Sequence, residues 1–557
     1  MTQKNPSNKT RDWTNTVVQF FFWASLFSVA YAQAPLYHSN QHQYFLHGLA
    51  QGGYGHLDAD WLANTADPTP LFSMLVSVTY QLLDELLFYF YYAMLMGVYV
   101  ASLVGIFSVL TKDQAPRTTR LTFIALFFLI HSAVVRCLSA RWFGTDYPWY
   151  FQAGVAGQYV LGPMFQPSTF GVFLILSLYS WARDRPMLAV ILSSLGATMH
   201  TTYLLPAALL TLSYMLALTY EKRLLRGLLT GSLSLALVLP IVVRNWMVFR
   251  PTSSATFIEA QRILFEDRIP HHTIVSIWCD WIACAQVLWV FIGIVLAWRT
   301  RLFIPLLVTS LLSCGLTMVQ VLTENHTLAL LFPWRSSVIL VPIATTIILT
   351  KAVSWCASFF QSSPESKSRI GEIAIWSLIG CLVVGGLAIM IFRLGFQTRD
   401  EELGMLEYVR EQKLKTNVYL LPIDVPNLKQ ILSKPEKKGS RKSDFIPRRK
   451  AQQDPQFIKV NLQRFRLYTG APIYVDFKSI PYKDTEVLEW KRRLDLNERL
   501  YAELKVKRGK DLDPVISKLL EEGITHIVAP TRDDIPDHPR LHAVFDEDRY
   551  FRVLEIR

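Results

Sequence analysis

The sequence predicts an α-helical polytopic membrane protein with a C-terminal α/β domain. The chain has 557 residues, of which 51% are hydrophobic and 18% are charged. From residue 16 to about residue 392, long apolar runs alternate with short polar loops. A run of about 17–25 apolar residues is what a helix needs to cross a bilayer. From about residue 397, charged and apolar residues mix as in a globular domain. We therefore expect a transmembrane domain over 1–396 and an α/β domain over 397–557.

Eleven apolar segments fit this pattern, and the basic residues between them predict an orientation. The segments are 16–33, 84–110, 121–138, 160–182, 187–199, 203–220, 226–243, 281–298, 302–322, 336–356 and 371–392. Lys and Arg cluster at 4–11, 112–120, 183–185, 222–226, 299–301 and 367–369. All these clusters fall on one side, which is the cytoplasm by the positive-inside rule. An odd number of spans then places residues 397–557 outside the cytoplasm.

Charge and cysteine usage exclude some classes of protein. The formal net charge is +12, but much of the excess in the membrane part lies in short loops, so nucleic acid is not an expected partner. All six cysteines lie in or beside apolar segments, which leaves the C-terminal domain without a disulfide framework. Cys279 and Cys284 could pair or bind a metal, although packing is the simpler role. The first apolar run, QFFFWASLFSVAYAQA, favours a retained span over a cleaved signal peptide because many helices follow it.

The long first loop, residues 34–70, carries the stretch GHLDADW. In it Asp58 and Asp60 are two residues apart and precede Trp61. Two carboxylates on an irregular loop can hold a hard cation such as Mg²⁺ or Mn²⁺, or one of them can take a proton from a hydroxyl. The alternative is a solvated turn with no chemical role.

Other polar residues fall on the same expected side as this loop, and ionisable groups at the membrane boundary usually mark a path or a site. Arg335, in FPWR, suits bidentate binding of phosphate, and Arg244 or Arg268 could share that role. A histidine there could be an acid, a ligand or a hydrogen-bond donor. Arg335 could instead extend to the lipid headgroups, and Asp146 could have no role beyond ending a turn. The candidate substrate-binding residues are Trp61, Asp146, His200, Tyr203, Arg244, Arg268, His271, His272 and Arg335.

The acidic motif GHLDADW, the polar turn HTTY, the arginine of FPWR and the layout of the chain resemble the GT-C class of membrane glycosyltransferases. More closely, NQHQYFLHGLA, RIPHH and FRLYTGAPIYVDFKS are similar to segments of uncharacterised bacterial multi-pass proteins. The resemblance implies a polyprenyl-phosphate-linked sugar transferred outside the cytoplasm. It also implies Asp58 and Asp60 as base or metal ligands, with Arg335 a looser match.

The sequence departs from two subgroups of that class. It lacks the WWDYG-like signature and second acidic motif of oligosaccharyltransferases, and the adjacent Asp-Glu pair of protein mannosyltransferases. A lipid or polysaccharide acceptor is therefore expected before a protein acceptor.

The C-terminal domain is expected to hold alternating helices and strands around a mainly parallel sheet. Helices are expected at 400–413, 484–508 and DPVISKLLEEG, and strands at NVYLLP, APIYVDF, ITHIVAP and FRVLEI. The basic tract 434–450 indicates a flexible loop, either solvated or close to anionic lipid headgroups. No glycine-rich phosphate loop follows any strand, so no nucleotide is expected.

These observations favour an inverting glycosyltransferase of the bacterial plasma (inner) membrane. Its expected partners are a polyprenyl-phosphate sugar, a lipid or glycan acceptor and membrane lipids, with Mg²⁺ or Mn²⁺ as a cofactor if Asp58 and Asp60 bind metal. The rival is a transporter or flippase for a lipid-linked glycan, which should show internal repeats and polar groups through the membrane depth. A non-catalytic subunit of an envelope assembly is the third alternative.

Overall fold

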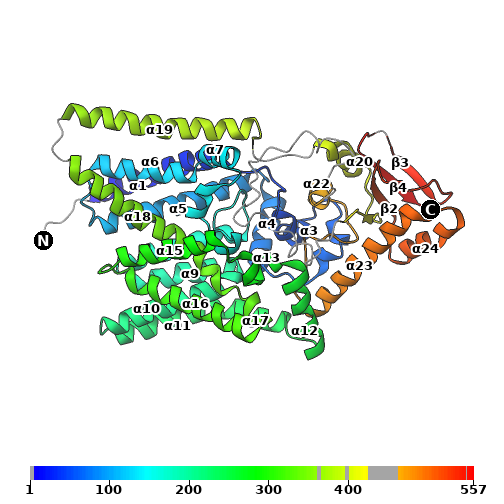
Figure 1. The fold of residues 1–557 in the computed structure, drawn as a ribbon, viewed down its shortest axis with the longest axis horizontal. Helices are drawn as coiled ribbons and strands as arrows, with labels where there is room; N and C mark the ends of the chain where they lie inside the picture. Colours follow the sequence, from blue (N-terminus) through cyan, green and yellow to red (C-terminus); the bar gives the residue numbers. More distant parts are fainter. Residues whose placement is uncertain (1–5, 361–364, 395–399, 424–461, 547) are drawn as a thin grey trace.

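A computed structural model describes residues 6–360, 365–394, 400–423, 462–546 and 548–557. Figure 1 shows long helices lying side by side across most of the molecule, with a smaller domain that contains the sheet at one end. Within the described ranges, six helices are long and apolar enough to cross a membrane, or seven if a bent pair counts as one span. The protein is thus a multi-pass helical membrane protein with a small C-terminal sheet, and the count of eleven spans stays a prediction.

The six long apolar stretches cover 87–110, 201–220, 224–248, 303–323, 326–358 and 369–391. The helices of this part are α1 (Pro6–Tyr31), α5 (Leu87–Leu110), α6 (Arg117–His131), α7 (Ala133–Phe143), α8 (Val172–Ala182), α9 (Pro186–Met199), α10 (Leu204–Tyr220), α11 (Leu224–Val248), α15 (Trp281–Leu296), α16 (Phe303–Thr323), α18 (Ser337–Phe360) and α19 (Glu365–Ile391). Shorter helices between them are α2 (Gln41–Tyr44), α3 (Leu46–Gln51), α4 (Pro70–Leu82), α12 (Ser254–Arg262), α13 (Pro270–Thr273), α14 (Val275–Trp278) and α17 (His326–Leu330).

Local sequence explains why several expected spans are shorter or bent. The span expected at 121–138 is the pair α6 and α7, which meet at 48°. Ser132 lies at the break in extended conformation, and its side chain accepts a hydrogen bond from the Val135 N–H, as an N-cap residue does. The span expected at 160–182 begins as regular α-helix only at Val172, because Pro163 and Pro167 interrupt the run before it.

Four basic loops meet at the end of the membrane part that lies away from the sheet. Arg183, after α8, forms an ion pair with Asp113, after α5 (2.6 Å). Asp184 accepts from Arg223, after α10 (3.1 Å), and from Arg301, after α15 (2.6 Å). The loops that the positive-inside rule groups together are therefore neighbours in space. The assignment of this end to the cytoplasm stays a prediction.

The C-terminal domain is a four-stranded sheet packed with helices, and its strand order is β1-β2-β4-β3. Its elements are α20 (Leu403–Gln412), β1 (Tyr419–Leu420), α22 (Phe465–Thr469), α23 (Asp484–Val506), α24 (Asp513–Glu521), β2 (His526–Pro530), β3 (Leu541–Phe545) and β4 (Phe551–Ile556). The expectation of a mainly parallel sheet is wrong. Only β1 pairs in parallel, with β2, whereas β4 pairs antiparallel with both β2 and β3.

One expected strand is not formed, and one strand of the sheet was not expected. The stretch 471–477 makes only an isolated bridge between Ile473 and Tyr419, because its backbone turns away to reach the membrane part. The strand β3 was not expected, since LHAVF follows a run of charged turn residues without clear alternation. The basic tract 434–450 lies outside the described residues.

The two parts of the chain share packing surfaces. Helix α12, from the loop after α11, packs along α23 of the C-terminal domain. Ala260, Ile263 and Leu264 are buried in the same apolar cluster as Trp490 of α23. The first loop joins from the other side, where Gly55 and Gly470 bring their backbones into contact. Figure 1 shows α3, α4 and α13 at this boundary.

Candidate functional site

A cavity of about 460 Å³ lies between the end of the membrane helices and the C-terminal domain. Segments that are far apart in the sequence meet around it. Its walls come from α2 and the end of the first loop, residues 157–168, the turn 200–205, the end of α11, residues 264–272, residues 330–335 and the segment 478–482. We call the last of these the roof segment, and the space it covers the central cavity.

The charged side chains that are described in the lining of the central cavity are all basic. Arg268, Arg335 and Lys478 line it, together with three histidines. None of the lining side chains that the structure describes is a carboxylate. Buried cations are costly unless a counter-charge accompanies them. The cavity is therefore suited to an anionic ligand.

Arg335 is held by two partners at the floor of the cavity. Its Nη2 lies 3.1 Å from Nε2 of His200, and its guanidinium carbon lies 5.1 Å from the centre of the Tyr203 ring. A guanidinium can only donate, so Nε2 of His200 accepts and Nδ1 must carry the ring proton of a neutral imidazole. That Nδ1 is buried and has no partner among the described residues. His200 thus positions Arg335 and offers a free N–H donor.

Arg268 and the roof segment bring two further cationic side chains to the cavity. Arg268 donates from Nη2 to the carbonyl oxygen of Lys478, and its guanidinium packs on the Phe477 ring at 5.3 Å. Burial, reinforced by the charge of Arg268, lowers the pKa of Lys478 to about 8. Lys478 is therefore mainly protonated at pH 7 and titrates just above it. The roof segment is held down by Gln43 of α2, whose side-chain N–H donates to the Tyr482 hydroxyl at 2.9 Å.

His272 is set up as a hydrogen-bond acceptor. Its Nδ1 lies 2.8 Å from the carbonyl oxygen of Ala156. A carbonyl only accepts, so Nδ1 carries the proton and Nε2 keeps its lone pair. Burial, with the neighbouring His271 second, holds the pKa of His272 well below its usual range. At neutral pH this imidazole is therefore uncharged, and its Nε2 can accept a hydrogen bond.

Several polar atoms around the central cavity lack partners. In the part of the chain that the structure describes, no hydrogen bond reaches the following buried atoms: Gln158 Oε1, Gln166 Oε1, Ser168 Oγ, Thr202 Oγ1, Arg268 Nε and Arg335 Nε. Most buried polar groups in proteins are hydrogen-bonded, so a cluster of unpartnered ones needs an explanation. A polar ligand with both donors and acceptors would satisfy them.

The lining of the central cavity also includes apolar side chains. They are Leu204, Leu205, Phe249, Leu264, Leu330, Leu331 and Phe332. These come from the ends of apolar helices or from the loops beside them, so a hydrocarbon chain could contact them. The lining thus combines positively charged and apolar side chains.

The structure places Asp58 and Asp60 away from this cavity. Asp58 is exposed, and its carboxylate accepts from Lys415 at 2.5 Å. Asp60 is buried, and its Oδ2 accepts from Nε of Arg466 at 2.8 Å and from the Ile473 N–H at 3.0 Å. Its Oδ1 accepts from the Leu62 N–H at 2.9 Å.

These contacts do not fit a divalent cation at the DxD motif. Each carboxylate already has a cationic partner, and the two face different partners. No group of three or more His, Cys, Asp or Glu with metal-site geometry occurs among the described residues.

The remaining candidate residues divide into those that line the cavity and those that do not. His200, Arg268, His271, His272 and Arg335 line it together, although they come from three separate regions of the sequence. Tyr203 does not line the cavity, but its hydroxyl donates to the carbonyl of the lining residue Ser168 at 2.7 Å. Arg244 donates to the Asp67 carbonyl at 2.9 Å, next to the lining residue Asn245.

Trp61 and Asp146 have structural partners elsewhere. The Trp61 ring lies 4.5 Å from the guanidinium carbon of Arg493, on α23. Asp146 is buried and accepts from Nε of Arg136 at 2.9 Å. Neither residue lines the cavity.

Sequence reasoning missed the roof segment. Lys478 and Tyr482 belong to FKSIPYK, which directly follows the stretch expected to be a strand. The proline and the flanking lysines indicate the end of a strand, but nothing local indicates that this loop reaches the membrane part.

Comparison with known families adds one finding. Residues 444–496 match DUF6798, a domain of unknown function. The match contains Arg466, which binds Asp60, and the whole roof segment. No curated protein matches the chain.

Proposed function

We propose that this protein is a membrane glycosyltransferase that takes a sugar from a polyprenyl-phosphate donor and transfers it to a lipid or polysaccharide acceptor. The observation that carries the proposal is the central cavity, which has three cationic side chains, no described carboxylate in its lining and seven apolar leucine and phenylalanine side chains. A lipid phosphate joins a negative charge to a hydrocarbon chain and matches both kinds of lining residue. The resemblance to GT-C enzymes supports the same substrate class.

In this proposal the phosphate lies against Arg335 and Lys478. Arg335 can bind two phosphate oxygens through its planar guanidinium, and its orientation is set by His200 and the Tyr203 ring. The unpartnered Gln158 and Gln166 oxygens then accept hydrogen bonds from the hydroxyls of the sugar. The isoprenoid chain contacts apolar lining side chains such as Leu204, Leu331 and Phe332.

His272 is the proposed general base. Its Nε2 takes the proton of the acceptor hydroxyl, and the acceptor oxygen forms a bond to the anomeric carbon. The bond from that carbon to the phosphate oxygen breaks, and the phosphate keeps the electron pair. Arg335 and Lys478 stabilise the charge that develops on it. Attack from the face opposite the phosphate inverts the anomeric configuration. A general base of this kind typically contributes about 10²–10⁴-fold to the rate.

The test is transfer from radiolabelled polyprenyl-phosphate sugars by purified protein in lipid nanodiscs. Arg335→Gln should abolish donor consumption, and His272→Gln should lower transfer by at least 100-fold while donor binding persists. Arg250→Gln is the matched control, because Arg250 is exposed and lies outside the cavity. The proposal is wrong if no donor is consumed, or if Arg250→Gln and Arg335→Gln have the same effect.

One observation favours a second function, namely binding or transport of a lipid-linked glycan without transfer. Asp58 and Asp60, the expected bases, are engaged by Lys415 and Arg466, and a carboxylate base is not described in the cavity lining. Donor binding that is lost in Arg335→Gln, with no product under any condition, would support this second function.

A further inference from the structure

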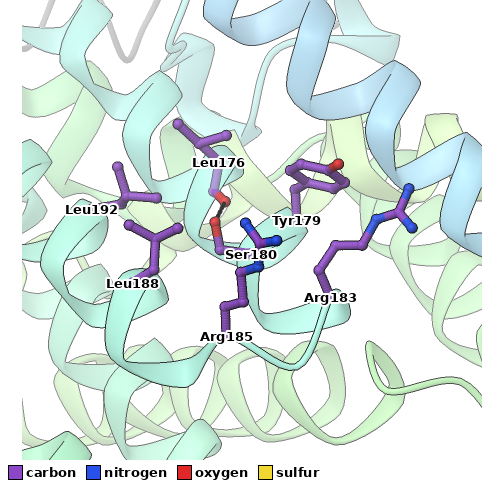
Figure 2. A pocket seen from close by; sticks show the side chains of 7 residues that line it. All are labelled: Leu176, Tyr179, Ser180, Arg183, Arg185, Leu188 and Leu192. Carbon is purple, nitrogen blue, oxygen red and sulfur yellow. Dashed lines mark hydrogen bonds between the residues drawn. The ribbon is translucent and has the colours of Figure 1, made fainter. Parts of the chain in front are cut away.

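A second pocket lies at the opposite end of the membrane part, between α8 and α9. It has a volume of about 370 Å³ and is lined by Leu176, Tyr179, Ser180, Arg183, Arg185, Leu188 and Leu192. Figure 2 shows Leu176, Leu188 and Leu192 together on one side, with the Arg185 guanidinium close to Ser180. We call this pocket the α8–α9 groove.

The two arginines of the α8–α9 groove differ in their partners. Arg183 forms a bidentate pair with Asp113, at 2.6 and 2.8 Å. Asp184, which lies between Arg183 and Arg185, forms ion pairs with Arg223 and Arg301. Arg185 has no ion pair within the described part of the chain, and it is exposed. The groove therefore carries an uncompensated positive charge.

A further feature favours an anion at this place. Arg185 directly precedes Pro186, the first residue of α9, so the positive end of the helix dipole lies at the mouth of the groove. The positive charge thus comes from a side chain and a helix end together.

The apolar side of the groove continues along α9. Leu188, Leu192 and Leu195 are spaced four and three residues apart and so lie on one helix face. Leu188 and Leu195 are 39% and 42% exposed, and α9 is one of the apolar helices of the membrane part. This stripe leads from the arginines into the depth of the bilayer.

We propose that the α8–α9 groove binds one anionic glycerophospholipid of the membrane itself. The headgroup phosphate contacts Arg185 at the start of α9, and one acyl chain lies along Leu188, Leu192 and Leu195. A soluble phosphate compound would use only the charged end and leave the leucine stripe uncovered. This site is separate from the central cavity and does not rest on the proposed transfer reaction.

Native mass spectrometry of the delipidated full-length protein tests the proposal. Phosphatidylglycerol and phosphatidylcholine with identical acyl chains are titrated separately. Wild type should bind one phosphatidylglycerol more tightly than phosphatidylcholine. Arg185→Gln should weaken phosphatidylglycerol about five-fold, the value of one basic residue near an anionic lipid, and leave phosphatidylcholine unchanged.

Two further variants make the outcome decisive. Arg299→Gln is the matched control, since Arg299 is an exposed arginine of the α15–α16 loop that does not line the groove. It should leave both affinities unchanged. Leu192→Trp fills the groove and should remove the tight site for both lipids. The proposal is overturned if wild type shows no headgroup preference, if Arg299→Gln matches Arg185→Gln, or if Leu192→Trp has no effect.

Discussion

A variant of Asp60 can distinguish a catalytic from a structural role of the first loop. The sequence predicts that Asp60 is catalytic, whereas in the structure its carboxylate is fully occupied by hydrogen-bond donors. Its carboxylate accepts from Arg466 and from backbone N–H groups of Leu62 and Ile473. Arg466 also donates to Asp476 at 2.7 Å. We predict that Asp60→Asn loosens the contact between the first loop and the C-terminal domain.

The size of the effect follows from burial. The Asp60 side chain is fully buried and that of Arg466 is 3% exposed. An asparagine has one acceptor oxygen, so its NH₂ group must face donors that Asp60 now accepts from. Removing one partner of a buried ion pair costs about 3–5 kcal/mol. Asp476 still balances Arg466, so we expect the lower end, about 3 kcal/mol. For a domain of this size that corresponds to a fall in unfolding midpoint of about 6–12 °C.

The assay is thermal unfolding in detergent together with hydrogen exchange of the peptides that contain Asp60 and Arg466. In Asp60→Asn, both peptides should exchange faster than in wild type. The double variant Asp60→Asn/Arg466→Gln should lose less stability than the sum of the two single variants, because the second change removes a charge that the first left unbalanced.

A different outcome of the same experiment would refute the structural role of Asp60. If Asp60→Asn keeps the wild-type midpoint and exchange rates but loses sugar transfer, Asp60 acts on the substrate. The structural role given to it here would then be refuted, and the catalytic role expected from GHLDADW would take its place.

Three other predictions follow from contacts described above. Binding of a lipid phosphate should weaken as pH rises through about 8, because Lys478 then loses its charge; burial lowers the pKa of Lys478 to about 8. In a binding titration, Lys478→Gln should bind the lipid phosphate less tightly at pH 7 and show no weakening near pH 8. Gly55→Ala should destabilise the C-terminal domain more than Gly53→Ala. Both glycines have positive φ, but a Cβ at Gly55 would overlap the backbone of Gly470, whereas a Cβ at Gly53 meets nothing within 4 Å. Equal unfolding midpoints of the two variants would contradict this prediction. Asp58→Asn should cost at most about 1 kcal/mol of stability, as expected for an exposed ion pair, and should leave sugar transfer near the wild-type rate.

Much of the architecture could be predicted because it is encoded locally. Apolar runs of helical length and basic loops are properties of neighbouring residues, and the structure forms apolar helices at these runs and brings four of the loops together. The turn HTTY, the RIPHH stretch and the arginine of FPWR were also expected to converge, and His200, His272 and Arg335 line one cavity.

The rest depends on contacts between distant segments. The partner of Asp60 lies 406 residues further along the chain, and that of Asp58 lies 357 residues further. Two carboxylates in GHLDADW look the same in sequence whether they face a substrate or an arginine of another domain. Lys478 is likewise recognisable only once the C-terminal domain has docked. Long-range docking decides which charges are balanced, and a short motif carries no information about it.

The contact between Asp60 and Arg466 can form only after most of the chain has been synthesised. A chain grows at about 5–20 residues per second, so the first loop is complete about 20–80 s before Arg466 is made. Until then Asp60 has no cation beside it, and the central cavity has no roof segment. A chain that stops before residue 462 would keep all the membrane helices yet lack Lys478. The cavity gains its full positive charge only when the last part of the chain arrives, because a chain that ends before residue 478 lacks one of the three cationic side chains that line it.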